Sequence, residues 1–246
     1  MNVRSVVSGS LAVVFIFLTS GRWTLDTIPT GWYGVQVIVH AVHETTRGRT
    51  TRVRMLDAAV AIIRRQGLAA TSVDELCAQA GVTKGAFFHH FASKDALAVA
   101  AVEYWSDTTG ALFAAASYHQ FPDPLDRVFG YLDFRLSLIS GPPAEFSCLA
   151  GTVVQEAFAS SPAIRAACEA SIFGHAATLE ADFGAAIDRY RVDDEVTAVS
   201  LAQHTQIVLQ GAFILSKAAN DPELVFESVR HLRRYLESLF GNRTYG

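Results

Sequence analysis

The stretch GVTKGAFFHHF at residues 81–91 decides how the whole chain is read. Gly81 suits the end of one helix, and the two residues after it leave room for a tight turn. The residues beyond the turn keep helical spacing, so those three or four apart share a face. The inward face is predicted to carry Phe87, His90 and Phe91. The outward face is predicted to carry Lys84, Gly85, Phe88 and His89.

The adjacent histidines suggest a metal or catalytic site, which helical geometry disfavours. Neighbouring residues of a helix point about 100° apart, so His89 and His90 cannot bind one ion together. No His–x3–His, Cys–x2–Cys or carboxylate cluster completes such a site. We therefore predict no metal, no cofactor and no catalytic residue. Phe87 and Phe91 are expected to be core, and His90 a partly buried histidine with local hydrogen bonds.

Two further helices are predicted before this stretch. Residues 51–66 form the first, and Gly67 suits its left-handed exit. Its apolar positions are Leu56, Ala59, Val60 and Ile63. Thr71 offers an N-cap to a second helix at 72–80, with Asp74 in a capping-box-like position. Together with the helix after Gly81 these segments form a helix-turn-helix.

Helices are also predicted for the rest of the chain. Ser93 caps a fourth helix that continues to about Tyr118. Breakers then fall at 122–124, 141–143, 160–162, 192–194 and 220–222, which leaves five further long helical segments. No segment alternates like a strand, and proline is scarce at 7 residues, so long helices are possible. The predicted fold class is all-α.

The chain of 246 residues has a net charge of −4, but the charge is distributed unevenly. Residues 47–95 hold eight Lys and Arg against four Asp and Glu, a net +4, whereas residues 96–246 hold ten against eighteen, a net −8. A basic head on an acidic body is the asymmetry expected when only the head binds nucleic acid. Three scattered cysteines favour a reducing, cytoplasmic setting over a disulfide framework.

The first 46 residues do not match the rest. VVSGSLAVVFIFLTSG at residues 6–21 is an apolar run too short for a comfortable membrane span. There are three hypotheses for this segment: an export signal, a membrane anchor, or a start codon assigned too early. We favour a disordered extension or a misassigned start, with the true start near Val39 or Val42. Export would carry a DNA-binding head away from its DNA.

The outward face of residues 84–91 suits the major groove of DNA. A lysine, a glycine that lets the backbone approach, a flat aromatic ring and a histidine can meet base edges or phosphates. An exposed Phe88 beside cations is unusual for a merely solvated face. Thr71 and Ser72 lie where the free N–H groups of a helix start favour a phosphate, and Lys94 is placed to hold the same DNA backbone. A basic arm carries Arg47, Arg49, Arg52 and Arg54.

Residues 52–97, RVRMLDAAVAIIRRQGLAATSVDELCAQAGVTKGAFFHHFASKDAL, resemble the N-terminal domain of the TetR/AcrR family of bacterial transcription regulators. The most telling part, GVTKGAFFHHFASKDAL, is similar to the pattern G-V-S-K-G-T-L-Y-Y-H-F-x-S-K-E-x-L. CLAGTVVQE at 148–156 and HTQIVLQGAFILSKA at 204–218 are more weakly similar to segments of some C-terminal domains of the family. The resemblance implies about nine helices, dimerisation through the last two long ones, a palindromic operator and repression relieved by a small molecule.

Carried over residue by residue, the resemblance implies DNA contacts at Thr71, Ser72, Thr83, Lys84, Gly85, Phe88, His89 and Lys94. Phe88 departs from the family, which usually has a tyrosine whose hydroxyl reaches a phosphate. We expect Phe88 to contact a sugar or a thymine methyl group instead. His89 likewise replaces a common tyrosine and is expected to take over the polar contact.

The acidic body is rich in aromatic residues and can hold an apolar or aromatic effector with a few polar anchors. The candidate effector-binding residues are Trp105, Phe134, Gln155, Phe158, His175 and His204. Cys148 follows a proline-containing loop and is read as an inert thiol, with an oxidant or electrophile sensor as the alternative. Segments 194–219 and 222–240 are apolar on one side and are predicted to form a four-helix dimer interface with their symmetry mates.

These inferences divide the chain into an extension at 1–46, a helix-turn-helix DNA-binding domain at 47–97 and a helical ligand-binding and dimerisation domain at 98–246. The expected protein is not an enzyme but a cytoplasmic, homodimeric, ligand-responsive repressor of double-stranded operator DNA. A membrane-tethered regulator that uses residues 6–21 is the alternative. An all-α enzyme with accidental helix-turn-helix similarity is less favoured, because no nucleophile–base–orienter set or phosphate loop can be assembled.

Overall fold

The structure is a computed structural model, and it describes residues 50–192 and 195–241. All regular elements in these ranges are helical, which confirms the all-α fold class. In chain order they are α1 (Thr51–Gln66), α2 (Val73–Ala80), α3 (Lys84–His90), α4 (Lys94–Ala114), the 3-10 helix η2 (Ser117–Gln120), α5 (Pro124–Ser137), α6 (Pro143–Phe146), α7 (Leu149–Ala157), α8 (Pro162–Ala177), α9 (Glu180–Tyr190), α10 (Ala198–Ala219) and α11 (Glu223–Leu239).

Hydroxyl side chains set where the first helices begin. The bounds of α1 agree with the prediction, and α2 begins one residue later than predicted. Ser72 is the N-cap of α2, since its Oγ accepts from the backbone N–H of Glu75, so the prediction that Thr71 caps this helix was wrong. Thr71 is only 2% exposed, and its hydroxyl donates to the carbonyl of Gly67 over 2.6 Å.

The turn between α2 and α3 has the predicted form. Gly81 ends α2 with φ 63° and ψ 44°, a left-handed conformation that glycine adopts without strain. Thr83 caps α3, and Ser93 caps α4 as predicted. The fourth helix ends at Ala114, where the prediction placed its end near Tyr118, because the chain tightens there into η2.

The body contains more helices than the resemblance implied. The predicted segment at 143–160 divides into the one-turn helix α6 and the longer α7. The segment at 162–192 divides into α8 and α9. Short hydrogen-bonded turns separate these pairs, so the described ranges exceed the expected nine helices without any change of fold class.

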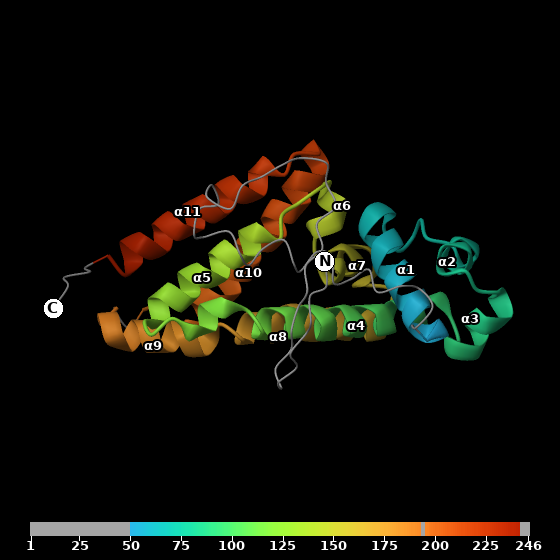
Figure 1. Cartoon of the computed structure of the whole chain (residues 1–246), viewed down its shortest axis with the longest axis horizontal. Coiled ribbons are helices and arrows are strands. Elements are labelled where there is room, and N and C mark those ends of the chain that lie inside the picture. Colours follow the sequence, from blue (N-terminus) through green and yellow to red (C-terminus); the bar gives the residue numbers. More distant parts are fainter. Residues whose placement is uncertain (1–49, 193–194, 242–246) are drawn as a thin grey trace, which may run out of the picture.

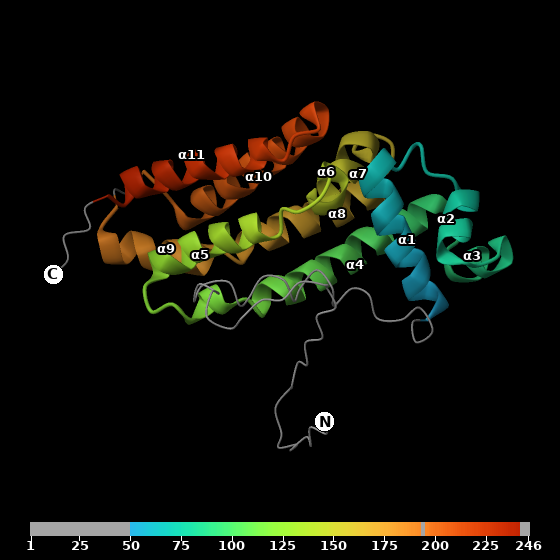
Figure 2. The same ribbon diagram turned by 45° about the horizontal axis from the view of Figure 1, so that its top comes forward.

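The head formed by α1–α3 lies at one end of an elongated molecule (Figure 1). α4 leads away from the head and packs along α8 (Figures 1 and 2). α10 packs against α8, α9 and α11, so α10 and α11 lie together on the side of the body opposite α4 (Figure 2). This arrangement leaves one face of α3 free at the tip of the molecule.

The buried apolar residues form two clusters. The first joins the head to the start of α4, and it also includes Leu149 and Val153 of α7 and Cys168 of α8. The second fills the body among α5, α9, α10 and α11. α4 runs without interruption across the predicted boundary between residues 97 and 98. Because α4 and α8 contribute side chains to both clusters, a movement in the body can reach the head.

The predicted extension at 1–46, with its apolar run at 6–21, lies outside the described residues, as do Arg47 and Arg49 of the basic arm. Within the described ranges, none of the helices combines the length and the hydropathy that crossing a membrane requires.

Candidate DNA-binding face and interior cavity

The face of α3 that points away from the molecule carries the residues predicted to lie there. Lys84, Gly85 and His89 are exposed, and Phe88 is 57% exposed. Phe87 on the opposite face is 0% exposed. Phe88 thus leaves a large apolar area in water, and a bound partner that covered this ring would gain the free energy of its burial.

His90 departs from the prediction, because it is exposed rather than partly buried. α3 ends at this residue, and the extended backbone of Phe91 (φ −137°) turns the next ring inward instead. The rings of His89 and His90 lie 5.0 Å apart. The described residues contain no group of three or more potential ligands that could hold a metal ion.

Lys84 is held by a carboxylate of the preceding helix. Its Nζ lies 2.7 Å from Oδ1 of Asp74, and both side chains are well exposed. The hydrogen bond to Asp74, followed by the charge of that carboxylate, raises the pKa of Lys84. The ammonium group is therefore fully charged at neutral pH and oriented across the start of α3.

Two exposed hydroxyls lie at the starts of α2 and α3. Ser72 Oγ accepts the Glu75 N–H over 3.1 Å, and Thr83 Oγ1 accepts the Ala86 N–H over 3.2 Å. In each hydroxyl the oxygen is the acceptor, so the O–H hydrogen can still be donated to an anion. The partial positive charge of a helix start favours the same kind of partner.

Lys94 does not present a free ammonium to the outside. Its Nζ donates to the carbonyls of Leu68 (3.0 Å) and Thr71 (3.1 Å) in the loop between α1 and α2. Thr71 itself is buried. Both side chains were predicted to contact DNA, and in this structure both instead hold the loop from which α2 begins. The sequence gives no sign of the Lys94 contacts, because they join residues 23 to 26 positions apart.

A carboxylate from α7 binds the other side of the loop between α1 and α2. Glu156 accepts the backbone N–H of Leu68 over 3.2 Å and that of Ala69 over 2.6 Å. Gly67, which starts the loop with φ 89°, leaves space that a Cβ would take from the Glu156 carboxylate. Glycine is required here both for its backbone conformation and for this close approach.

Arg64 of α1 makes a second link between head and body. Its Nε donates to the carbonyl of Ser147 over 2.8 Å, and its NH2 group donates to the carbonyl of Glu145. The guanidinium lies 4.6 Å from the ring centroid of Trp105 on α4. Burial lowers the pKa of Arg64 to about 10, which still leaves it charged at neutral pH.

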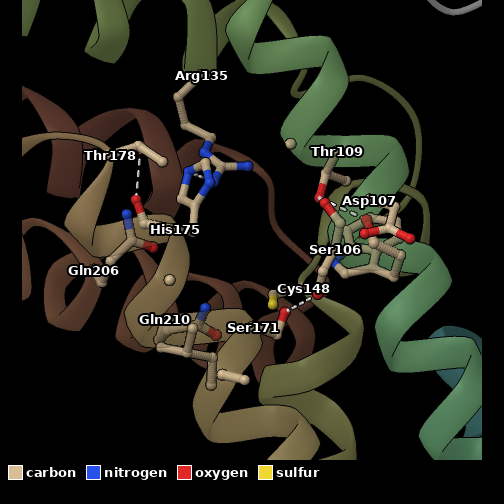
Figure 3. Close-up of a pocket in the computed structure, with 15 residues that line it drawn as sticks. Ser106, Asp107, Thr109, Arg135, Cys148, Ser171, His175, Thr178, Gln206 and Gln210 are labelled. Carbon is tan, nitrogen blue, oxygen red and sulfur yellow. Dashed lines mark hydrogen bonds between the residues drawn. The ribbon is translucent and has the colours of Figure 1, made fainter.

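The body contains a cavity of about 220 Å³ between α4, α5, α8 and α10 (Figure 3). Of the predicted effector-binding residues, Trp105 and His175 line it. Gln155 lines a neighbouring groove of about 240 Å³ with Lys217, and Cys148 lines both spaces.

The other three predicted effector residues lie elsewhere. Phe134 packs edge-on against Phe113, with 5.1 Å between ring centroids, and is absent from the cavity wall. Phe158 is 60% exposed. His204 is exposed on α10, with its ring 5.4 Å from that of Tyr235. These three were predicted wrongly as cavity residues, because aromatic content alone does not say which side of a helix faces inward.

The prediction missed the most distinctive residue of the cavity. Arg135 of α5 lines it together with Gln206 and Gln210 of α10. A signal was present in the sequence, since Arg135 is the one cation in the predominantly apolar run YLDFRLSLI at 131–139. A cation in such a run is costly to bury and therefore worth examining.

The three cysteines differ in environment. Cys77 and Cys168 are buried, and burial raises the pKa of both thiols, that of Cys168 to about 12. Cys148 is half-buried at the start of α7, where its Sγ accepts the Gly151 N–H over 3.4 Å. It is therefore the most accessible thiol of the described residues, and its role as inert thiol or sensor stays a prediction.

The outer face of α10 exposes large apolar residues. Ile207 is 66% exposed, Leu215 58% and Ile214 46%. Positions seven and eight apart share one face of a helix, so these three side chains form a stripe. Tyr235 of α11 is 44% exposed and adjoins it through His204.

The chain resembles known proteins in sequence and in fold. Residues 55–101 match the family described as bacterial regulatory proteins, tetR family. A HTH-type transcriptional regulator, YerO of Bacillus subtilis (strain 168), is 38% identical over 52 residues, which is 21% of this chain. The match spans 18% of that relative's length.

Solved structures share the fold over most of the chain. A TetR-family transcriptional regulator from Agrobacterium tumefaciens is 20% identical, with a TM-score of 0.67 over 77% of this chain and 98% of that one. A TetR transcriptional regulator from Chloroflexus aurantiacus J-10-FL is 26% identical, with a TM-score of 0.66 over 78% of this chain and 96% of that one.

Proposed function

Since the chain belongs to the TetR family of transcriptional regulators, we propose that it is a cytoplasmic repressor. It binds a palindromic operator in double-stranded DNA as a homodimer, and a small molecule that enters the body cavity releases it. Members of this family are regulators and not enzymes, in agreement with the expectation for this chain. The observation that carries the proposal is the outward face of α3, with Phe88 57% exposed beside Lys84 and His89.

The composition of this face fits the major groove better than it fits solvent. The side chains proposed to contact DNA are Ser72, Thr83, Lys84, Gly85, Phe88 and His89. Gly85 supports the proposal, because a Cβ built on it would meet only Thr83 Oγ1, at an ordinary 3.7 Å. The fold does not need a glycine at this position, whereas a backbone that approaches DNA closely does.

Thr71 and Lys94 have a different part in the proposal. They hold the loop before α2 and so place the start of α2 against a phosphate, without touching the DNA with their side chains. Arg52, which is exposed at the start of α1, is the described member of the basic arm best placed to add charge. Arg54 is half-buried, and its Nε is buried without a hydrogen-bond partner in the described part of the chain.

The link between cavity and head gives the effector a physical route. Trp105 lines the cavity and packs on Arg64, which in turn binds the Ser147 carbonyl beside Cys148. α7 begins at this point, and Glu156 in its last turn binds the loop before α2. A ligand that shifts α4 or the start of α7 would therefore move the head through Arg64 and Glu156, which changes the spacing of two heads in a dimer.

The homodimer is proposed to form through α10 and α11. The stripe of Ile207, Ile214 and Leu215 is an apolar surface that a monomer would leave in water. Facing its symmetry mate, it would become the centre of a four-helix interface, with Tyr235 at its edge. A dimer of this kind sets two α3 helices on successive turns of a palindrome.

The test is footprinting of the purified protein on the DNA that flanks its own gene. We expect a protected palindrome, and binding that weakens steeply with salt, by roughly −0.9 in the log–log slope for each phosphate contacted. Absence of any protected site there, together with no enrichment in a genome-wide selection, would reject the DNA-binding proposal.

A further inference from the structure

The cavity in the body holds a cation that forms no ion pair with any residue of the described ranges. Arg135 projects from α5 to the cavity wall beside His175 of α8 (Figure 3). None of the ion pairs formed within the described residues includes Arg135. Its Nε is buried and has no hydrogen-bond partner in those ranges.

The groups around Arg135 are apolar or neutral. The guanidinium lies 4.5 Å from the ring centroid of Phe113 and 5.9 Å from that of Phe213. Its one polar contact within the described part of the chain is with Nε2 of His175, 3.3 Å from NH2. Burial, and then the charge of Arg135, lower the pKa of His175 to about 3, so this imidazole is neutral at physiological pH. A neutral ring orients the guanidinium but leaves its charge uncompensated.

Next to His175 the other polar groups of the body are neutral hydrogen-bonding groups. Gln206 Nε2 donates to Tyr131 Oη over 3.0 Å, and Tyr131 Oη lies 3.0 Å from His175 Nε2. Gln210 lines the cavity from the same face of α10. A partly buried cation without a counter-ion destabilises a protein, and such a group persists where a ligand supplies the missing charge.

We propose that this cavity binds a small organic carboxylate whose two oxygens pair with the guanidinium of Arg135. This assignment rests on the proposed function, of which it names the effector class. A guanidinium offers two parallel N–H donors that match a carboxylate. Trp105 and Ile172 provide an apolar wall for the body of the molecule.

The size of the cavity and the charges in its wall further restrict the class of ligand that it can bind. A cavity of about 220 Å³ lies below the range for drug-sized ligands, so the effector is compact. Asp107 lines the cavity on the side away from Arg135 (Figure 3), and its carboxylate would repel a second negative charge. A monocarboxylate is therefore preferred to a dicarboxylate or to a phosphate dianion.

The experiment measures the melting temperature and the calorimetric affinity of the full chain with acetate, butyrate and benzoate. Each carboxylate is compared with its uncharged amide, namely acetamide, butyramide and benzamide, and with inorganic phosphate. We expect at least one carboxylate to raise the melting temperature where its amide and phosphate do not. Equal effects of acid and amide, or no effect of any carboxylate, would overturn the proposal.

Two variants test whether the carboxylate binds at Arg135. Arg135→Met should weaken carboxylate binding about ten- to a hundred-fold, as expected for a lost charged hydrogen-bonded pair. Arg165→Met makes the same change at an exposed position of α8 and should bind like the wild type. Without ligand, Arg135→Met should melt no lower than the wild type, because it removes an uncompensated charge. A clearly lower melting temperature would show that Arg135 is structural, and the proposal would then fail.

The DNA-binding proposal is tested separately by salt-dependent binding to a labelled duplex. A protein that binds DNA but no carboxylate would refute the effector class and leave the repressor intact. A carboxylate that binds at Arg135 without weakening DNA binding would keep the site and refute its role as effector site.

Discussion

Lys84 and Asp74 form an ion pair across the turn between α2 and α3, with 2.7 Å between Nζ and Oδ1. The pair lies on the face that is proposed to meet DNA, so the carboxylate both orients the lysine and competes with a phosphate for it. A fully exposed ion pair of this kind is weak, so Lys84 can exchange Asp74 for a phosphate at little cost in free energy.

Asp74→Asn is therefore expected to strengthen DNA binding. The variant frees Lys84 for a phosphate and removes a negative charge from the interface, so affinity for duplex DNA should rise roughly two- to fivefold at moderate salt. Fluorescence anisotropy with a labelled duplex measures it. Asp188→Asn makes the same change on α9, at the far end of the body from the head, and should have no effect. Unchanged or weaker binding of Asp74→Asn would show that Lys84 does not contact DNA.

Gly85→Ala separates the fold from the interface. Alanine is a better helix former by up to about 1 kcal/mol, and its Cβ meets no obstacle in the free protein, so the melting temperature should stay the same or rise. DNA affinity should fall by about tenfold if the helix backbone comes close to the groove. Gly184→Ala on α9 is the control, because the added Cβ there meets only Ala198 at 3.8 Å. Retained affinity in Gly85→Ala would place the DNA elsewhere.

Phe88→Tyr tests the orientation of the same face. The added hydroxyl points away from the protein on a ring that is 57% exposed, where it can donate to a phosphate, so affinity should hold or increase. Phe173→Tyr, on a ring of α8 that is 54% exposed, should leave DNA binding unchanged. A loss of binding in Phe88→Tyr alone, measured at matched salt, would show that this face of α3 is assigned wrongly.

The local features of the head could be predicted because they depend on neighbours in the sequence. Gly81, Thr83 and Ser93 mark helix ends through their own backbone or hydroxyl chemistry, and the burial of Phe87 follows from helical spacing. The cap of α2 was predicted at Thr71 but lies at the adjacent Ser72, and only packing distinguishes these two hydroxyls. The contact of Thr71 with the Gly67 carbonyl buries one and leaves the other to cap.

The body could not be predicted to the same depth, because its contacts join distant segments. Lys94, Glu156 and Arg135 each have partners 23 or more positions away, and no local pattern reports them. α10 carries apolar residues on both its buried and its exposed faces, so its sequence does not indicate which face is buried. His204 was assigned to the interior and lies on the outside.

Ile207→Glu is expected to break the homodimer. A charge in the middle of the α10 stripe would have to be desolvated in the interface, which costs several kcal/mol, whereas the monomer already leaves this position 66% exposed. Sedimentation velocity should show a monomer with unchanged helical content, and binding to a palindrome should weaken strongly. Phe173→Glu, which puts the same charge on an exposed apolar position of α8, should remain a dimer. A dimeric Ile207→Glu protein would place the interface on another surface.

Glu156→Gln tests the route from body to head. A neutral amide accepts the Leu68 and Ala69 N–H groups less strongly than a carboxylate, so the loop before α2 should loosen while the core of the head stays intact. We expect a loss of about 1 kcal/mol in stability, faster hydrogen exchange at the amides of Leu68 and Ala69, and weaker operator binding. The salt dependence of DNA binding should not change, because Glu156 lies on α7 and its substitution removes no phosphate contact.

Glu169→Gln, at an exposed position of α8, is the matched control and should behave like the wild type. Hydrogen exchange at Leu68 and Ala69 could become faster while operator affinity and its response to the effector stay the same. In that case Glu156 holds the loop but does not transmit a movement of the body to α2. The coupling between cavity and head would then have to run through Arg64 alone.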